Sequence, residues 1–309
     1  MNLEKEINEI VGFKNLELLA TQVVEGFISG LHKSPFHGFS AEFAEHKIYN
    51  NGESTKHIDW KLFAKTDKLY TKRYEEETNL RCHLILDNSS SMHYPAKGEM
   101  HIKSLNKIGF CSLASAAIMN LMKRQRDSVG MSIYSDHYEF YSNEKASERH
   151  HQKLLQQLNK AIGSKSSGVQ TKTYAHLHLI AEKLKRRSLV FLFTDMFQSD
   201  KEQHELFEAL QHLKYNKHEV VLFHTYDKEK ELRFDFNNRP KKFVDIETSE
   251  HINLYPDNVK QSYEAAVQSY FDTLALKCGH YRIKYVPVDV NENFNTILTT
   301  YLVERARFG

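Results

Sequence analysis

Three oxygen-bearing side chains are spaced two residues apart at the end of an apolar run. The run Cys82 to Leu86 is followed by Asp87, Ser89 and Ser91. A carboxylate with hydroxyls two and four residues later places three hard oxygen donors on one side of a turning loop. Such donors suit Mg²⁺, which prefers six oxygen ligands and usually keeps several as water. The spacing therefore predicts a site for a divalent cation.

Two further oxygen donors follow later segments of the sequence. Asp195 comes just after the apolar run Leu189 to Phe193, and Thr173 lies in the polar loop that precedes it, where Thr171 is a competing hydroxyl. Because the carboxyl ends of parallel strands meet at one edge of a sheet, we expect these donors at the same edge as Asp87.

Each of these residues also has a purely structural interpretation. The string Asp-Asn-Ser-Ser-Ser can be a turn that caps the following helix, and Asp195 can be a helix N-cap. A threonine in a loop is most often a solvated hydroxyl. The occurrence of all five donors in the expected chain order favours the metal site.

Short apolar runs alternate with helical patterns over the second part of the chain. Such alternation is typical of an open α/β fold with a mostly parallel sheet and helices on both faces. These sheets bind ligands at the carboxyl ends of their strands, where the strand order reverses. Strands are predicted at 82–86, 129–134, 137–141, 189–193, 219–224, 242–246 and 281–286, and helices at 104–126, 148–162, up to 187, 201–214, 257–277 and from 293.

The first part of the chain has a different pattern. Apolar spacing predicts one or two helices within 2–31, whereas 34–79 is irregular and rich in charged and aromatic residues. We expect an amino-terminal extension, residues 1–79, packed on a main domain, residues 80–309. The sequence Ile58-Asp59-Trp60-Lys61 has two interpretations, a packed corner anchored by the sole tryptophan or a partner surface.

Composition limits the classes of protein. The 309 residues carry 42 Lys+Arg against 40 Asp+Glu, so a formal charge of +2 argues against a dedicated nucleic-acid binder. No stretch approaches the ~20 apolar residues of a membrane helix, and the charged start of the chain leads us to expect a cytoplasmic protein. Cys82, Cys111 and Cys278 lack metal-binding or disulfide spacing, and we expect buried reduced thiols.

The five donors resemble the metal-ion-dependent adhesion site of von Willebrand factor A domains. Its pattern Asp-x-Ser-x-Ser, a later Thr and a later Asp is matched by Asp87, Ser89, Ser91, Thr173 and Asp195. Thr173 is preferred to the competing threonine because it starts the Thr-x-x-x-x-x-Leu pattern of that family. The resemblance implies that these residues bind Mg²⁺ or Mn²⁺ directly or through water. It also implies that an Asp or Glu of a partner protein fills one open coordination position.

A second resemblance concerns the segment before this site. The chain is similar to one bacterial family, the domain of unknown function 58, from about residue 30 to the end. Members are often encoded beside AAA+ ATPases of the MoxR type, which the resemblance implies as partners. The matching motifs are Glu42-Phe43-x-Glu45, Tyr49-x-x-Gly52, Ile58-Asp59-Trp60-Lys61, Ala64-Lys65, Leu69-Tyr70-x-Lys72-x-Tyr74-x-x-Glu77 and Tyr301-Leu302-x-x-Arg305.

The same residues argue against several classes of enzyme. A haloacid-dehalogenase-type phosphotransferase needs a second aspartate where Ser89 stands. No Gly-x-Ser-x-Gly elbow and no glycine-rich phosphate loop follows a predicted strand, so we expect neither a serine hydrolase nor ATP binding. The histidine pairs 150–151 and 176/178 lack the spacing of a helical zinc pair, and we expect surface or capping histidines.

Together these observations predict a non-catalytic, divalent-cation-dependent protein-binding module that acts as an adaptor or co-factor of a MoxR-type AAA+ ATPase. One alternative is a metal-dependent hydrolase or phosphotransferase that uses the same strand-end ion. Another is a structural domain whose metal site is vestigial.

Overall fold

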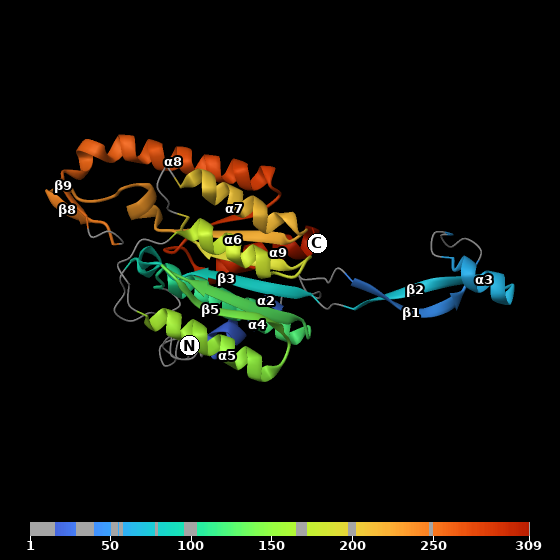
Figure 1. Cartoon of the computed structure of the whole chain (residues 1–309). Helices are drawn as coiled ribbons and strands as arrows, with labels where there is room; N and C mark the ends of the chain where they lie inside the picture. Colours follow the sequence, from blue (N-terminus) through green and yellow to red (C-terminus); the bar gives the residue numbers. More distant parts are fainter. Residues whose placement is uncertain are drawn as a thin grey trace.

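A six-stranded sheet forms the centre of the protein in the computed structural model (Figure 1), which describes residues 16–28, 40–50, 55, 58–77, 80–95, 104–164, 172–196, 202–246 and 250–308. The strands are β3 (Arg81–Asp87), β4 (Ser128–Tyr134), β5 (Tyr138–Lys145), β6 (Leu189–Thr194), β7 (Glu219–Tyr226) and β10 (Lys284–Asp289). Their order across the sheet is β10-β7-β6-β3-β4-β5. Neighbouring strands are parallel except β5, which runs antiparallel to β4 at one edge. The predicted mixed α/β fold with a mostly parallel sheet is confirmed.

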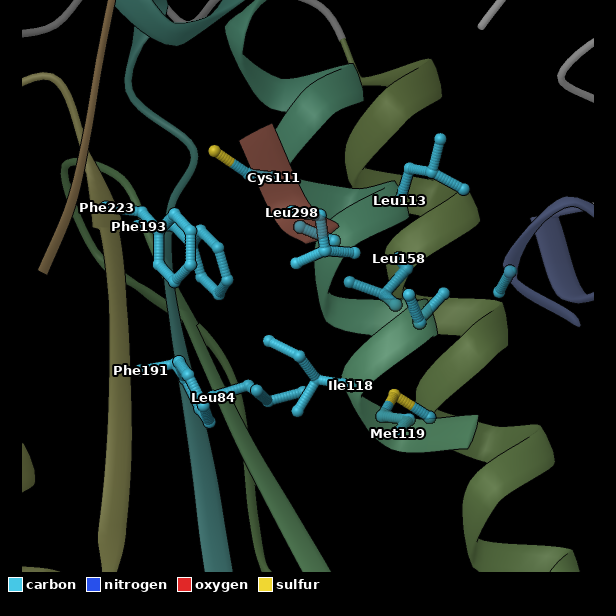
Figure 2. Packing of buried hydrophobic residues seen from close by; sticks show 14 of the residues in the cluster. Leu84, Cys111, Leu113, Ile118, Met119, Leu158, Phe191, Phe193, Phe223 and Leu298 are labelled. Atoms are coloured by element: carbon cyan, nitrogen blue, oxygen red, sulfur yellow. The ribbon is translucent and has the colours of Figure 1, made fainter. Parts of the chain in front are cut away.

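Helices cover both faces of this sheet. One face packs against α4 (Lys107–Arg124), α5 (Glu148–Gly163) and α9 (Phe294–Phe308), and the other against α6 (Thr173–Lys183), α7 (Gln203–Tyr215) and α8 (Pro256–His280). Because strand side chains alternate between faces, Leu84 belongs to the first core and Ile85 to the second. In Figure 2, Leu84 and Phe191 of the sheet face Ile118 of α4.

The helix α2 (Leu16–Ile28) adds a further layer on the first face. Leu16, Leu19 and Val24 are buried in the same core as α4, and α2 packs on α4. The sheet lies on one side of α4, and the helices α2 and α5 lie on its other sides. The helix α4 is therefore buried along most of its length. A predicted amino-terminal helix is thus present, whereas the division of the chain at residue 79 stays a prediction.

The described residues between 40 and 77 form an arm of two strands and a helix where the sequence predicted irregular structure. The strands β1 (Ser40–Ile48) and β2 (Tyr70–Glu77) pair antiparallel, and the short helix α3 (Trp60–Thr66) lies between them. The arm projects from the body of the protein (Figure 1). The irregular prediction was wrong because charged residues interrupt the apolar alternation by which a strand is recognised.

A small lobe follows β7. It contains the π-helical turn η3 (Lys228–Leu232) and a two-stranded antiparallel sheet of β8 (Lys241–Val244) and β9 (His251–Leu254). The strand predicted near 242–246 therefore exists but does not belong to the central sheet. Because β7 ends at the rim where β3 and β6 also end, the lobe lies at the predicted ligand-binding rim.

Two expectations from composition concern the whole chain. Cys82, Cys111 and Cys278 are buried and free, as predicted. Within the described ranges, no helix has both the length and the apolar character needed to cross a membrane.

Gly130 permits a close contact across three strands. It pairs in register with His83, whose Nδ1 lies 2.8 Å from Glu144 Oε1 and whose Nε2 lies 2.7 Å from Ser132 Oγ. A Cβ atom at position 130 would lie 2.7 Å from His83 Nδ1 and 2.7 Å from the Ser142 carbonyl oxygen. The absent side chain therefore lets β3 connect to the edge strand β5 over β4.

We expect Gly130→Ala to lower the free energy of unfolding by about 1–3 kcal/mol, as overpacking usually does. The matched control is Gly279→Ala in α8, where a Cβ atom meets nothing within 4 Å. That variant should be neutral or more stable by up to about 1 kcal/mol, because alanine favours a helix. Denaturant unfolding measures both, and equal stability of the two variants would contradict the packing argument.

Candidate metal centre

The predicted donors lie at the point where the strand order reverses. β3 and β6 are parallel neighbours, and the chain leaves β3 toward α4 on one face but leaves β6 toward α7 on the other. Loops that diverge in this way leave a crevice at the carboxyl ends of the two strands. Asp87 is the last residue of β3 and Asp195 directly follows β6.

Asp87 is held at both carboxylate oxygens. Its Oδ1 accepts a hydrogen bond of 2.9 Å from the Ser89 backbone N–H, and its Oδ2 accepts one of 2.8 Å from the Thr194 hydroxyl. The side chain is almost fully buried. Its orientation is therefore fixed by the turn on one side and by the adjacent strand on the other.

The two serine hydroxyls meet each other. Ser89 Oγ lies 3.1 Å from Ser91 Oγ, within the loop that leads into the 3₁₀ turn η2 (Ser90–His93). Ser89 precedes this turn but its side chain does not cap it, and the cap of α4 is Asn106. The serine side chains therefore do not cap a helix. Their hydroxyls lie next to each other on one side of the loop.

Asp195 lies close enough to Asp87 to affect its ionisation. Burial, together with the Asp195 charge, raises the pKa of Asp87 to about 6, although the hydrogen bonds from Ser89 and Thr194 act in the opposite direction. Asp195 is not the N-cap of α7, which is Glu202. Two buried carboxylates therefore share one crevice, where the Asp195 charge disfavours ionisation of Asp87.

The backbone around Asp195 is strained and anchored. The Asp195 carbonyl accepts a 2.8 Å hydrogen bond from His224 Nε2, and the next residue, Met196, has a left-handed φ of 55°. The Tyr270 hydroxyl of α8 donates to the Met196 carbonyl. A non-glycine residue in this conformation is uncommon and persists only where its surroundings enforce it.

Thr173 is the first residue of α6 and is buried. Its side chain and that of Thr194 lie beside the hydroxyl of Tyr134, which is the register partner of Asp87. Burial and the Asp87 charge raise the pKa of this tyrosine, and the two threonines oppose the effect. Thr173 thus reaches the same rim as Asp87, while the competing Thr171 lies outside the described residues.

The donor set fits a hard divalent cation. It contains two carboxylates and three hydroxyls, all oxygen, which is the chemistry that Mg²⁺ and Mn²⁺ prefer. In the part of the chain that the structure describes, no cluster of three or more His, Cys, Asp or Glu side chains could hold a metal. A cation at this rim would therefore depend on the hydroxyl donors.

The family model described as "Protein of unknown function DUF58" matches residues 45–270, which is more than half of the chain. The chain belongs to the DUF58 family.

Curated relatives of this DUF58 chain share only a segment with it. They include "Uncharacterized protein Rv1480" of Mycobacterium tuberculosis (strain ATCC 25618 / H37Rv) and "Uncharacterized protein Mb1516" of Mycobacterium bovis, each 26% identical over 81 residues. The matched segment is 26% of this chain and 26% of each relative. The chain thus matches about a quarter of the length of these relatives.

Solved structures overlap the DUF58 chain loosely. The protein BatB from Bacteroides thetaiotaomicron gives a TM-score of 0.42 at 13% identity, covering 74% of this chain and 99% of that one. An aerotolerance-related membrane protein from Bacteroides fragilis gives 0.43 at 12% identity, covering 74% and 100%. At these TM-scores the likenesses carry no argument about fold or function.

Two residues of the DUF58 crevice were not predicted from the sequence. Lys107, the first residue of α4, donates from Nζ to Asp195 Oδ2 at 3.1 Å and also to Glu231 of η3. A lysine in the first turn of a long apolar helix opposes the helix dipole, and this anomaly could have flagged Lys107. Nothing in the sequence pattern pointed to Glu231.

The expectation for two of the histidines was wrong. His150 and His151 are buried in α5 rather than exposed, and His150 Nε2 donates to the Val129 carbonyl at 3.0 Å. Because their helix packs against the first face of the body, these polar side chains are covered in spite of their polar neighbours in sequence. His178 Nδ1 lies 2.9 Å from His212 Nδ1, which joins α6 to α7.

The packed-corner interpretation of the single tryptophan was also wrong. Trp60 is 62% exposed at the start of α3 and contacts Phe63 edge to face. The preceding Asp59 is the N-cap of this helix and lies 3.0 Å from His46 Nε2. The cap fixes the start of the helix, and most of the tryptophan side chain faces solvent.

We expect Thr194→Val to lower the free energy of unfolding by about 1–3 kcal/mol, because it removes a buried hydrogen bond to a carboxylate. The matched control is Thr273→Val on the exposed side of α8, where the hydroxyl bonds only within its helix. That change should stay within about 0.5 kcal/mol. Denaturant unfolding in chelator measures both, and a Thr194→Val protein as stable as the control would contradict this role of Thr194.

Proposed function

We propose that this DUF58 chain is a non-catalytic protein-binding module that depends on a divalent cation. Asp87, Ser89, Ser91, Thr173 and Asp195 would hold Mg²⁺ or Mn²⁺, and an Asp or Glu of a partner protein would complete the coordination shell. We also propose that the sheet is of the von Willebrand factor A type, with the metal at its strand-order switch point.

One observation carries this proposal. Asp87 and Asp195 are buried together, and the pKa of Asp87 is raised by burial and by the Asp195 charge. A cation between them would relieve this repulsion, and the nearby pair of serine hydroxyls would supply neutral ligands. Since few of the ligands are anionic, the bound ion would stay electrophilic and attract another carboxylate.

The groups beside Asp195 support binding rather than catalysis. His224 donates from Nε2 to the Asp195 carbonyl, and its Nδ1 lies 2.7 Å from the Tyr285 hydroxyl. Burial lowers the pKa of His224 to about 4, so the ring is neutral near pH 7. Lys107 is engaged by Asp195 and Glu231. Both side chains are thus held by protein partners rather than poised beside a substrate water.

A MoxR-type AAA+ ATPase is our proposed partner, on the ground of the family resemblance, and a cytoplasmic location is proposed with it. The projecting arm supports a role in binding. Trp60 and Ile48 are exposed there, and Lys47, Lys61 and Lys65 lie in the same segment. Exposed aromatic side chains next to charges are typical of interface cores and rims.

We expect Mg²⁺ or Mn²⁺ to raise the melting temperature of chelator-treated protein, by an amount set by RT ln(1 + [L]/Kd). Asp87→Ala should abolish the rise, because it removes a ligand between the two loops. The control Asp272→Ala changes an exposed carboxylate on α8 and should keep the rise. Equal melting curves with and without metal for the parent would reject the metal site.

Partner capture tests the second half of the proposal. We expect immobilised parent protein to retain the MoxR-type ATPase of the same organism, and Asp87→Ala to lose it. Comparison of variants is preferable to chelation, since the ATPase itself requires Mg²⁺. Capture that is equal for parent and Asp87→Ala would exclude a metal-bridged contact.

The arm has its own test. Trp60→Ala should weaken ATPase capture about tenfold or more, as truncation of an interface tryptophan often does, while the metal-induced rise in melting temperature stays unchanged. The control is Tyr215→Ala, an aromatic residue 81% exposed on α7. Equal loss of capture in both variants would show that the arm has no specific role.

A further inference from the structure

Lys107 is buried in a place that does not suit a lysine. Its side chain has no exposure, and among the described residues it is the one lysine or arginine that is buried. It also lies at the first position of α4, next to the N-cap Asn106, where the helix dipole disfavours a cation. Burial of an ammonium group costs several kcal/mol unless carboxylates surround it. The position therefore requires an explanation from its partners.

Those partners are two carboxylates, one directly after β6 and one in η3. Lys107 Nζ lies 3.1 Å from Asp195 Oδ2 and also donates to Glu231. Burial disfavours the charged ammonium, but the two carboxylates that contact it stabilise its charge. The lysine is therefore a fixed positive charge that occupies one oxygen of a proposed metal ligand.

Glu231 is a second carboxylate with which the Lys107 ammonium pairs. Its Oε2 accepts a 2.7 Å hydrogen bond from the Asp227 backbone N–H, and the Tyr263 hydroxyl donates to its carbonyl at 2.9 Å. The carboxylate is thus held by the backbone at the start of η3, and the Glu231 backbone by α8, both independently of Asp195. Because the stem of a lysine is flexible, its ammonium can remain with Glu231 if Asp195 turns to a metal ion.

We propose that Lys107 is a tethered counter-ion of the metal centre, which occupies Asp195 in the metal-free protein and must yield it to Glu231 when a divalent cation binds. The inference rests on the proposed function, since it names a residue that sets the affinity of the same site. Lys107 weakens metal binding in two ways. It competes for an Asp195 oxygen, and it places a positive charge next to the incoming ion.

The test measures Mn²⁺ binding by titration calorimetry to the full chain and to variants of the pair. Lys107→Met should bind Mn²⁺ at least about tenfold more tightly than the parent, a change of ~1.4 kcal/mol. Glu231→Gln should bind more weakly, because it removes a carboxylate that can hold the ammonium away from Asp195. Lys123→Met changes an exposed lysine of the same helix and should bind as the parent does.

A double variant separates competition from net charge. Lys107→Met with Glu231→Gln removes one charge of each sign, so the total charge of the crevice stays that of the parent. It also leaves no unpaired Glu231 that could prevent folding. Tighter Mn²⁺ binding than in the parent supports the tethered counter-ion. Binding equal to the parent shows that only net charge matters and overturns it.

The outcomes also distinguish this inference from the proposed function. If the parent binds Mn²⁺ and Asp87→Ala does not, but both Lys107 variants bind no more tightly than the parent, the counter-ion is rejected while the metal site stands. If the parent and the Lys107 variants all fail to bind Mn²⁺, the metal site is rejected and the counter-ion with it.

Discussion

Two buried carboxylates of like charge occupy one crevice, and much of the surrounding structure offsets that cost. Thr194 donates to Asp87, the Ser89 N–H donates to its other oxygen, and Lys107 pairs with Asp195. The pKa of Asp87 stays raised in spite of these contacts. A fold that needed only stability would place apolar residues here, because buried charges are seldom a net gain. This cost supports the proposed role of the two carboxylates as ligands of a cation.

The strand order of the sheet brings these residues together. Asp87 and Asp195 are far apart in the chain, but β3 and β6 are neighbours whose following helices lie on opposite faces. The same rim receives η3 after β7, which carries Glu231 toward Lys107. Three crossover loops thus contribute to one crevice, and the long helix α8 fixes two of them through Tyr270 and Tyr263.

The mostly parallel sheet could be predicted from the sequence because its signals are local, whereas the five donors stay a prediction that rests on spacing and on a family resemblance. Apolar runs mark the buried strands, and the spacing of Asp87, Ser89 and Ser91 is readable within one loop. The pairing of Lys107 with Glu231 could not be predicted from the sequence, since two residues 124 positions apart become neighbours only through the sheet order. The exposure of Trp60 could not be predicted either, because the sequence around an aromatic residue in a charged segment looks the same in a packed corner and on an exposed arm.

The edge strand β10 has a consequence for how the protein meets other chains. Edge strands present unpaired backbone groups that can recruit a foreign strand and start aggregation. Pro287, within β10, lacks the amide hydrogen that such pairing would use, and Lys284 puts a charge at the start of the strand. Proline and lysine residues in edge strands commonly prevent such pairing. Growth of the sheet into a second molecule is thereby discouraged at this border.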